Sequence, residues 1–302
     1  MGVYDQAARF AAKADPAVVP ARLLMGSGLA LTFREWLDTR TLPLPGGTDR
    51  TADLIAALDD TASPDAPWLL VLEFQAQHDP DKLDVTLEEV AVFRSRARHG
   101  DGAGKYKVAA GLVYLRDRCP DDNLDMRFPD GTGTRHAPRI WNVAQDDAPT
   151  TLEAVATGTM SWGMLFWIPL MAGADTDATA QRWKELVLAN VTESAQRNMA
   201  AVVEFFSELA GRGIVWKRIL EEFNVTESQV ANEWIAQGEV KGRLTDRREI
   251  LLGLLNKRFP GVVPTEIAKL INEQESLDLL KYWINAVVDA GTFHDFMAVL
   301  KQ

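Results

Sequence analysis

The stretch WLLVLEFQAQ, from Trp68 to Gln77, decides the fold that this sequence predicts. It is a short apolar run bounded by turn residues, which is typical of a buried strand. The segment ADLIAAL, from Ala52 to Leu58, belongs to the same length class, and residues 59–67 between the two are rich in Asp, Thr, Ser and Pro. The pattern predicts that the two segments pair as a hairpin with a nine-residue loop.

Three polar residues stand out against this apolar background. Side chains alternate along a strand, so Glu73 and Gln75 are expected to share one face while Phe74 points to the other. Asp53 starts the preceding strand in an apolar setting, and a buried carboxylate is costly unless it is paired or bound to a metal. In a hairpin, Asp53 and Glu73 would face each other, which is unfavourable without a cation between them. The alternative is that Asp53 merely caps a turn or a helix.

The first half of the chain alternates helical and extended patterns. Residues Tyr4 to Met25 predict a helix broken at Asp15-Pro16, and Asp84 to Arg98 predict a second helix. Three further segments predict strands: Leu31 to Leu37, Lys107 to Leu115 and Arg139 to Val143. This order, helix, three strands, helix and strand, indicates an α/β fold.

Beyond residue 150 the pattern is mainly helical. A capping box at Thr226 and Gln229 predicts one helix start, and the stretch Gly238 to Gly242 is predicted to be a linker. We therefore expect a core at 1–150, a helical extension at 151–240 and a small helical domain at 241–302. The predicted helices are Ala180 to Val191, Glu193 to Leu209, Val215 to Phe223, Asp246 to Phe259, Pro264 to Glu273, Leu277 to Ala290 and Thr292 to Leu300.

Composition narrows the function classes. The formal charge of -11 argues against a surface that binds nucleic acid everywhere, so such a function needs a local basic patch. Cys119 is the only cysteine, which excludes an intramolecular disulfide and a cysteine-based metal cluster and suits the cytoplasm. The apolar run from Met160 to Ala172 is too short to span a bilayer, and we interpret it as buried core, with a membrane-peripheral patch as the alternative.

Several short motifs together resemble a known family. The pieces EWLDTR (35–40), ADL (52–54), LEFQ (72–75) and GLVYLRD (111–117), in this order and spacing, resemble the Rpn family of recombination-promoting, transposase-like nucleases of the PD-(D/E)xK superfamily. The runs IWNV (140–143) and LFWIPLMAG (165–173) look like the middle of those proteins. Residues 251–290 are similar to a small helical domain of unknown function often attached to them. Each motif is short, so the resemblance depends on their co-occurrence.

The resemblance implies a PD-(D/E)xK-like mixed sheet flanked by helices and a metal-dependent DNA endonuclease, linked to recombination or a mobile element. Asp53 and Glu73, with the Phe74 carbonyl, would bind Mg²⁺ or Mn²⁺, which activates water for attack on the phosphodiester. Gln75 would stand where the superfamily has a lysine and could orient the water. The family commonly has Arg directly before Ala-Asp, whereas here Thr51 holds that position and the arginine is Arg50.

Other polar residues are candidates for supporting roles. Asp5, Asp38 and His78 could approach the site as accessory groups, although such acids more often cap or turn the chain. Contacts to the DNA phosphates could come from a group of cations around the end of the helix after the site: Arg94, Arg96, Arg98, Lys105 and Lys107. Alternatively, these cations simply complement the helix dipole.

Two further interpretations remain open. The acidic composition and Gln75 permit a catalytically weak or inactive nuclease fold that acts as a binding or regulatory protein. The C-terminal helices could instead make a self-associating scaffold, because one predicted helix has an amphipathic face that suits a homo-oligomer. The residues of that face are Leu277, Leu280, Trp283, Ile284 and Val287.

Overall fold

The computed structural model describes residues 2–37, 52–77, 79–99, 106–116, 122–225, 228–261 and 263–300. These residues form two compact units, Met1–Ala231 and Asn232–Gln302. The first unit is α/β and contains a five-stranded mixed sheet, and the C-terminal half of the chain is mostly helical, as the sequence predicts. Residues 151–231, predicted as a separate extension, lie within the first unit.

The sheet has the strand order β1-β2-β3-β4-β7. Its strands are β1 (Leu31–Leu37), β2 (Leu54–Asp60), β3 (Trp68–Gln75), β4 (Lys107–Tyr114) and β7 (Arg139–Asn142). Strands β1, β2 and β3 pair antiparallel, whereas β3, β4 and β7 pair parallel. The predicted hairpin is therefore present as β2 and β3.

The loop of this hairpin is shorter than predicted, because β2 continues through Asp60. Asp60 is buried, and one of its carboxylate oxygens accepts the backbone N–H groups of Ala62 and Ser63 at 3.0 and 3.2 Å. Its other oxygen accepts the indole N–H of Trp68 at 3.2 Å. Asp60 therefore belongs to the end of β2 and to its turn. Because the residue is acidic, the sequence pattern assigns it to the loop.

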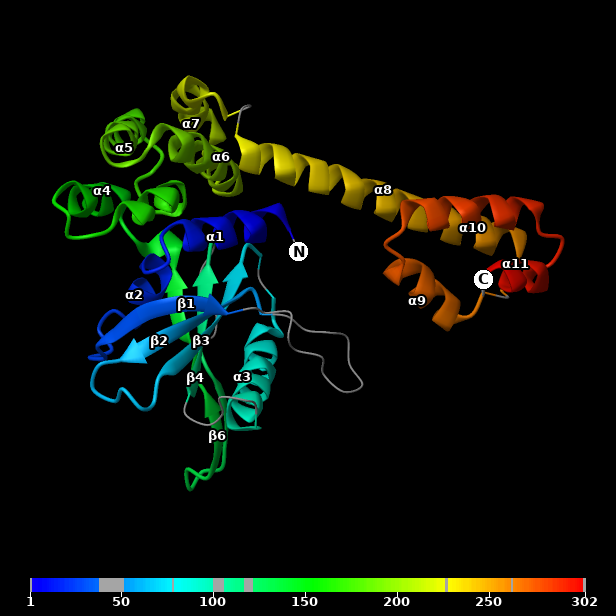
Figure 1. Cartoon of the computed structure of the whole chain (residues 1–302), viewed down its shortest axis with the longest axis horizontal. Coiled ribbons are helices and arrows are strands. Elements are labelled where there is room, and N and C mark those ends of the chain that lie inside the picture. Colours follow the sequence, from blue (N-terminus) through cyan, green and yellow to red (C-terminus); the bar gives the residue numbers. More distant parts are fainter. Residues whose placement is uncertain are drawn as a thin grey trace. The chain divides into compact units, whose positions relative to one another are not determined.

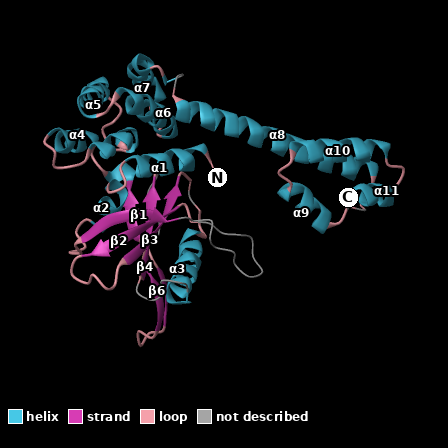
Figure 2. Ribbon diagram, viewed as in Figure 1, coloured by secondary structure: helices cyan, strands magenta, loops and turns pink. Residues whose placement is uncertain are grey.

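Different helices cover the two faces of the sheet (Figure 1, Figure 2). Helix α3 (Lys82–His99) connects β3 to β4, and its Phe93 is buried in one cluster with strand residues of one face, among them Ile55 and Val71. Helix α2 (Val18–Leu24) lies on the other face, where a β-carbon at Gly111 would come within 2.7 Å of Leu23. Helix α1 (Val3–Ala14) runs across the end of the sheet at which β3 and β4 finish (Figure 1).

The rest of the first unit packs around an aromatic cluster. Phe74 of β3 stacks on Trp167 with ring centroids 6.2 Å apart, and Trp167 also contacts Trp141 and Phe206. The run from Met160 to Ala172 forms the 3-10 helices η3 (Trp162–Phe166) and η4 (Ile168–Leu170), which are almost fully buried. The prediction that this run is core is confirmed.

Four helices and two short 3-10 turns complete this unit. Helix α1 packs against α6, and α6 packs against α7. The bounds are η2 (Val143–Gln145), α4 (Ala148–Ala156), α5 (Asp177–Asn190), α6 (Glu193–Leu209), α7 (Gly213–Leu220) and η5 (Glu221–Phe223).

One two-stranded sheet was not predicted. Strands β5 (Leu124–Arg127) and β6 (Gly133–His136) form an antiparallel hairpin between β4 and β7. Gly131 in its turn and Gly133 at the start of β6 have φ of 87° and 121°, a backbone region that favours glycine. Both strands are only four residues long, and β6 (GTRH) contains no apolar side chain, so the sequence pattern does not reveal the hairpin.

The second unit is helical. It contains most of α8 (Gln229–Arg258) together with α9 (Thr265–Glu273), α10 (Leu277–Asp289) and α11 (Phe293–Leu300). The predicted linker at Gly238 to Gly242 is wrong, because these residues lie inside α8. Glycine lowers helix propensity by only about 1 kcal/mol per residue, and the residues between these two glycines are compatible with a helix.

Part of the amphipathic face of α10 packs inside the second unit. Leu280, Trp283 and Val287 are buried in the core of the second unit, together with Leu251 and Leu255 of α8. Leu277 and Ile284 of the same face are only partly buried, so self-association through these helices stays a prediction.

Among the helices that the structure describes, none combines the length and the apolar character that crossing a bilayer requires.

Replacing Gly242 distinguishes a continuous helix from a linker. No atom lies within 4 Å of a β-carbon added at Gly242, so Gly242→Ala should raise the free energy of unfolding by about 0.5–1 kcal/mol. Gly242→Pro should lower it by about 3 kcal/mol, because proline removes a helical hydrogen bond. Denaturant unfolding followed by circular dichroism measures both. Two near-neutral substitutions would contradict the continuous helix.

Candidate active site

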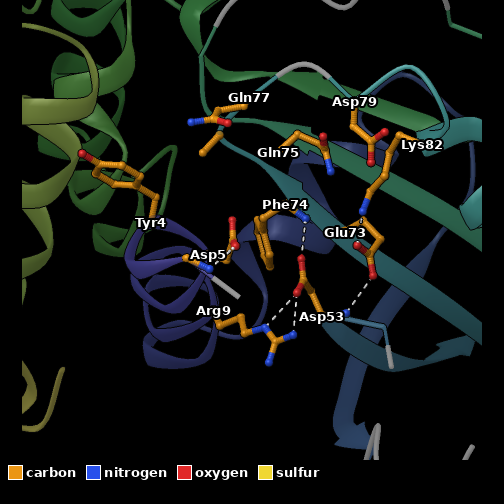
Figure 3. A pocket seen from close by; sticks show the side chains of 12 residues that line it. Tyr4, Asp5, Arg9, Asp53, Glu73, Phe74, Gln75, Gln77, Asp79 and Lys82 are labelled. Atoms are coloured by element: carbon orange, nitrogen blue, oxygen red, sulfur yellow. Dashed lines mark hydrogen bonds and ion pairs between the residues drawn. The ribbon is translucent and has the colours of Figure 1, made fainter. Parts of the chain in front are cut away.

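Asp53 and Glu73 meet where β2 begins and β3 ends. The last paired residues in the register are Leu54 and Leu72, so the next pair along both strands is Asp53 and Glu73. The backbone N–H of Asp53 donates to Glu73 Oε1 at 2.9 Å, and the backbone N–H of Phe74 donates to Asp53 Oδ2 at 2.8 Å. Each carboxylate thus bonds the backbone of the other strand, which closes the end of the hairpin with two acidic side chains (Figure 3).

A lysine from α3 faces the second oxygen of Glu73. Helix α3 begins at Lys82, two residues before the predicted start at Asp84, and this first turn brings the side chain to the end of β3. Lys82 Nζ lies 2.5 Å from Glu73 Oε2, and both side chains are largely buried, with 12% and 7% of their surface exposed. The pair is therefore a buried salt bridge, which is sensitive to the loss of either partner.

Gln75 contacts the same lysine. With its amide oriented to suit its neighbours, the Gln75 amide oxygen accepts from Lys82 Nζ at 3.0 Å, and its nitrogen donates to the Gln77 carbonyl at 2.9 Å. Glu73 and Gln75 therefore share a face of β3, as alternation predicts, while Phe74 lies against Trp167 on the other face. The ammonium group of Lys82 lies beside the position that Gln75 holds on the strand.

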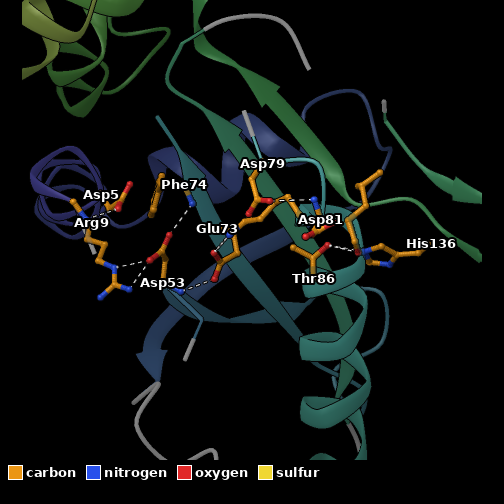
Figure 4. A network of polar contacts seen from close by, with 12 residues as sticks. Asp5, Arg9, Asp53, Glu73, Phe74, Asp79, Asp81, Thr86 and His136 are labelled. Carbon is orange, nitrogen blue, oxygen red and sulfur yellow. Dashed lines mark hydrogen bonds and ion pairs between the residues drawn. The ribbon is translucent and has the colours of Figure 1, made fainter. Parts of the chain in front are cut away.

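An arginine from α1 holds the second carboxylate. Arg9 Nε and Nη2 donate to Asp53 Oδ1 at 3.0 and 2.5 Å (Figure 4). The side chains of Arg9 and Asp53 are 21% and 12% exposed. The four charged groups in direct contact, two carboxylates and two cations, therefore balance one another.

These groups line a cavity of about 620 Å³ (Figure 3). Asp5, predicted as an accessory acid, lies in its wall, and its Oδ2 accepts the N–H of Gly2 at 2.8 Å, so the residue also caps α1. Asp79 lies in the same wall. The full lining is Gly2, Tyr4, Asp5, Arg9, Asp53, Glu73, Phe74, Gln75, Ala76, Gln77, Asp79 and Lys82.

Burial and neighbouring charges shift the pKa values of two groups in the cavity, Glu73 and Lys82. Burial raises the pKa of Glu73 above its ordinary value, the Asp53 charge raises it further, and Lys82 only partly opposes this. Burial alone would lower the pKa of Lys82, but the negative charges of Glu73, Asp53 and Glu89 outweigh it, so this pKa is raised. The ionised forms of Asp53 and Glu73 therefore depend on neighbouring positive charge.

The donor set fits a hard divalent ion only in part. Within the described ranges, no group of three or more His, Cys, Asp or Glu side chains is placed to hold a metal. Asp53 and Glu73 supply carboxylate oxygens, which suit Mg²⁺ or Mn²⁺ ions that retain several waters. The N–H and C=O of a strand residue point toward the same neighbour, so the Phe74 carbonyl is on the side of Asp53 and not of β4. Two acids and one carbonyl are thus available, and water would complete the coordination.

Several predicted phosphate contacts lie far from this cavity. Arg94 is exposed on α3 and follows Lys82 by about 18 Å along the helix axis, at 1.5 Å per residue. Lys107 is opposite Trp68, at the other end of β3 from Glu73, where its Nζ lies over the Trp68 ring and 3.5 Å from Asp60. Neither residue lines the cavity, because α3 and β4 run away from it, and their contact with DNA phosphates stays a prediction.

The remaining predicted residues are outside what the structure describes. Asp38, His78 and Lys105 lie outside the described residues, and so do the side chains of Arg96 and Arg98 in the last turns of α3. The two cations that the structure does bring to the site, Arg9 and Lys82, were not predicted. A weak signal existed for Arg9, which lies four residues after Asp5 and so shares a helix face with it.

Comparisons with known proteins add no assignment. A scan against protein-family models and searches of curated proteins and of solved structures found no match to this chain.

The charge balance of the cavity predicts a pH-dependent loss of stability in Lys82→Met. This change leaves the Glu73 carboxylate buried beside Asp53 without its cation, so the free energy of unfolding should fall by roughly 3 kcal/mol at pH 7. It also raises the Glu73 pKa further above the ordinary 4.5 of the unfolded chain. The folded variant then binds a proton, and the deficit should shrink as the pH falls through that raised pKa.

Urea unfolding of both proteins between about pH 5 and pH 8 measures this dependence. The double variant Lys82→Met/Glu73→Gln is the control, and it should lose most of the pH dependence because no buried charge remains unpaired. A deficit that stays constant with pH would contradict the pairing of Lys82 with Glu73.

Proposed function

We propose that this chain is a metal-dependent DNA endonuclease with its active site in the Asp53–Glu73 cavity. The observation that carries the proposal is the pair of carboxylates, Glu73 buried and Asp53 partly buried, each fixed by the other strand's backbone where β2 begins and β3 ends. Such a pair can hold a divalent cation, and that cation would in turn neutralise charge on the anionic phosphodiester. The motif resemblance to the Rpn family supports the same reaction.

A divalent ion held by Asp53, Glu73 and the Phe74 carbonyl would supply an acidified water and would polarise the scissile phosphate. The chain's own groups divide the remaining work. Asp53 and Glu73 are positioned by backbone N–H donors, so their oxygens need little reorganisation. Gln75 has no proton to exchange, but its amide can orient a water.

Lys82 supplies the positive charge that Gln75 lacks. Its ammonium lies between Glu73 and Gln75, and its raised pKa keeps it protonated at neutral pH. A fixed positive charge at this point can stabilise the charge that develops on the attacked phosphate. We therefore assign to Lys82 the electrostatic role that the resemblance gives to the residue at position 75.

A role in recombination or in a mobile element, in the cytoplasm, follows from the resemblance and from the single cysteine. A second candidate function is an inactive nuclease fold that binds nucleic acid without cleaving it. It is favoured by the small number of acids at the site and by the two cations that already neutralise them.

The cleavage proposal is tested by nicking of supercoiled plasmid with Mg²⁺, Mn²⁺ or EDTA. Asp53→Asn and Glu73→Gln should each reduce the metal-dependent rate at least about 100-fold, because each removes a charged ligand. Asp59→Asn is the matched control: Asp59 lies on β2 and pairs with Arg34, away from the cavity, and should keep the wild-type rate. Unchanged cleavage in both cavity variants would refute the proposal, and binding without cleavage in the wild type would favour the second candidate.

The role of Lys82 is tested by moving the lysine. The Gln75 amide and Lys82 Nζ are in contact, so a lysine at position 75 can bring its ammonium to the same region. Lys82→Gln should lower kcat about 10²-fold with little change in KM, and Gln75→Lys/Lys82→Gln should recover most of the loss. No recovery in a double variant that unfolds like the wild type would show that Lys82 does not act through the position of its charge.

A further inference from the structure

Both oxygens of Asp53 are engaged before any ion arrives. Oδ2 accepts the Phe74 N–H, and Oδ1 accepts two donors from the Arg9 guanidinium. Glu73 is engaged as well, by the Asp53 N–H and by Lys82. A divalent ion that binds here therefore enters a site whose charges are already balanced.

The ion and the guanidinium are incompatible at the same oxygen. An ion bound to Asp53 Oδ1 would lie within a few ångströms of Arg9, and like charges at about 4 Å repel by several kcal/mol in a partly buried site. Among the interactions that the structure describes, Arg9 bonds the Asp53 carboxylate, and Asp5 Oδ2 in the same cavity wall accepts the Gly2 N–H. One of the two cations must therefore leave Asp53 for the other to bind well.

Arg9 is the cation that competes at this position. It is more exposed than Lys82 (21% against 12%), and it belongs to α1, which lies outside the sheet and packs against α6 (Figure 1). Among the contacts that the structure describes, Lys82 bonds Glu73 and Gln75 and not Asp53 Oδ1, so it blocks a different oxygen. Asp53 Oδ1, the ligand atom that a metal needs at the start of β2, is thus bonded by one side chain, Arg9 of α1.

We propose that Arg9 is a built-in competitor of the divalent ion for Asp53, so that α1 sets how tightly the site binds metal. The inference rests on the proposed function, because it assumes that Asp53 is a metal ligand. The guanidinium and the ion occupy Asp53 Oδ1 in turn, and occupancy by Arg9 lowers the apparent affinity of the site for the ion. Removal of the Arg9 charge should therefore strengthen metal binding.

The test measures Mn²⁺ binding to the full chain by titration calorimetry, with the signal of free Mn²⁺ in electron paramagnetic resonance as a second readout. Arg9→Met should lower the Kd for Mn²⁺ about tenfold relative to the wild type. Arg9→Gln keeps a hydrogen-bond donor for Asp53 without the charge, so it should shift the Kd in the same direction even if Arg9→Met folds poorly.

Arg22→Met is the matched control. Arg22 forms an equally buried salt bridge with Asp146, the two side chains being 25% and 14% exposed, and this pair lies outside the cavity lining. It should destabilise the chain to a similar degree and leave the Mn²⁺ Kd unchanged. A tenfold effect confined to the Arg9 variants supports competition.

Equal or weaker Mn²⁺ binding in both Arg9 variants, with clear binding by the wild type, would overturn the competition and leave the metal site intact. Binding by neither the wild type nor the Arg9 variants would overturn the competition together with the proposed metal-dependent function. The wild-type titration therefore separates the failure of this inference from the failure of the proposed function.

Discussion

The architecture of the first unit depends on two carboxylates that lie side by side, Glu73 buried and Asp53 partly buried. Asp53 and Glu73 each accept a backbone N–H from the opposite strand, which fixes both of them at one end of the β2–β3 hairpin. Their charges cannot lie there alone, because an unpaired buried charge costs several kcal/mol. Helices α1 and α3 therefore have to bring Arg9 and Lys82 to this end of the sheet, and the cavity is the space that these four groups enclose.

Strand β3 connects this polar end to the core of the unit. Glu73 and Gln75 face Lys82, whereas Phe74 between them stacks on Trp167 from the segment after residue 150. Trp167 in turn contacts Phe206 of α6, the helix against which α1 packs. Residues 151–231 thus pack on the face of β3 opposite Glu73 and Gln75. This packing is the physical reason that they belong to the first unit.

The sequence pattern is informative about local secondary structure, but it does not predict which distant segments come into contact. Alternation along 68–77 correctly placed Glu73 and Gln75 on one face, and the apolar run ending at Ala172 was correctly read as core. Arg9 could not be recognised, because its partner lies 44 residues away and only the docking of α1 brings them together. Arg94 and Lys107 do not line the cavity for the converse reason: they are near the site in sequence, but α3 and β4 carry them away from it. The linker predicted at Gly238 to Gly242 is wrong because two glycines weaken a helix without ending it.

The packing of α1 against α6 also sets an order of events during synthesis. Phe10 of α1 contacts Phe166, with ring centroids 6.1 Å apart, and the α6 surface beside α1 ends only at Leu209. A nascent chain emerges from the ribosome with its N-terminal segment first, so α1 is made early but gains its partners late. The hairpin that carries Asp53 and Glu73 can pair well before that point, because its contacts are local. Arg9 is consequently among the last groups to reach the site, and Asp53 passes through the early stages of folding without its guanidinium.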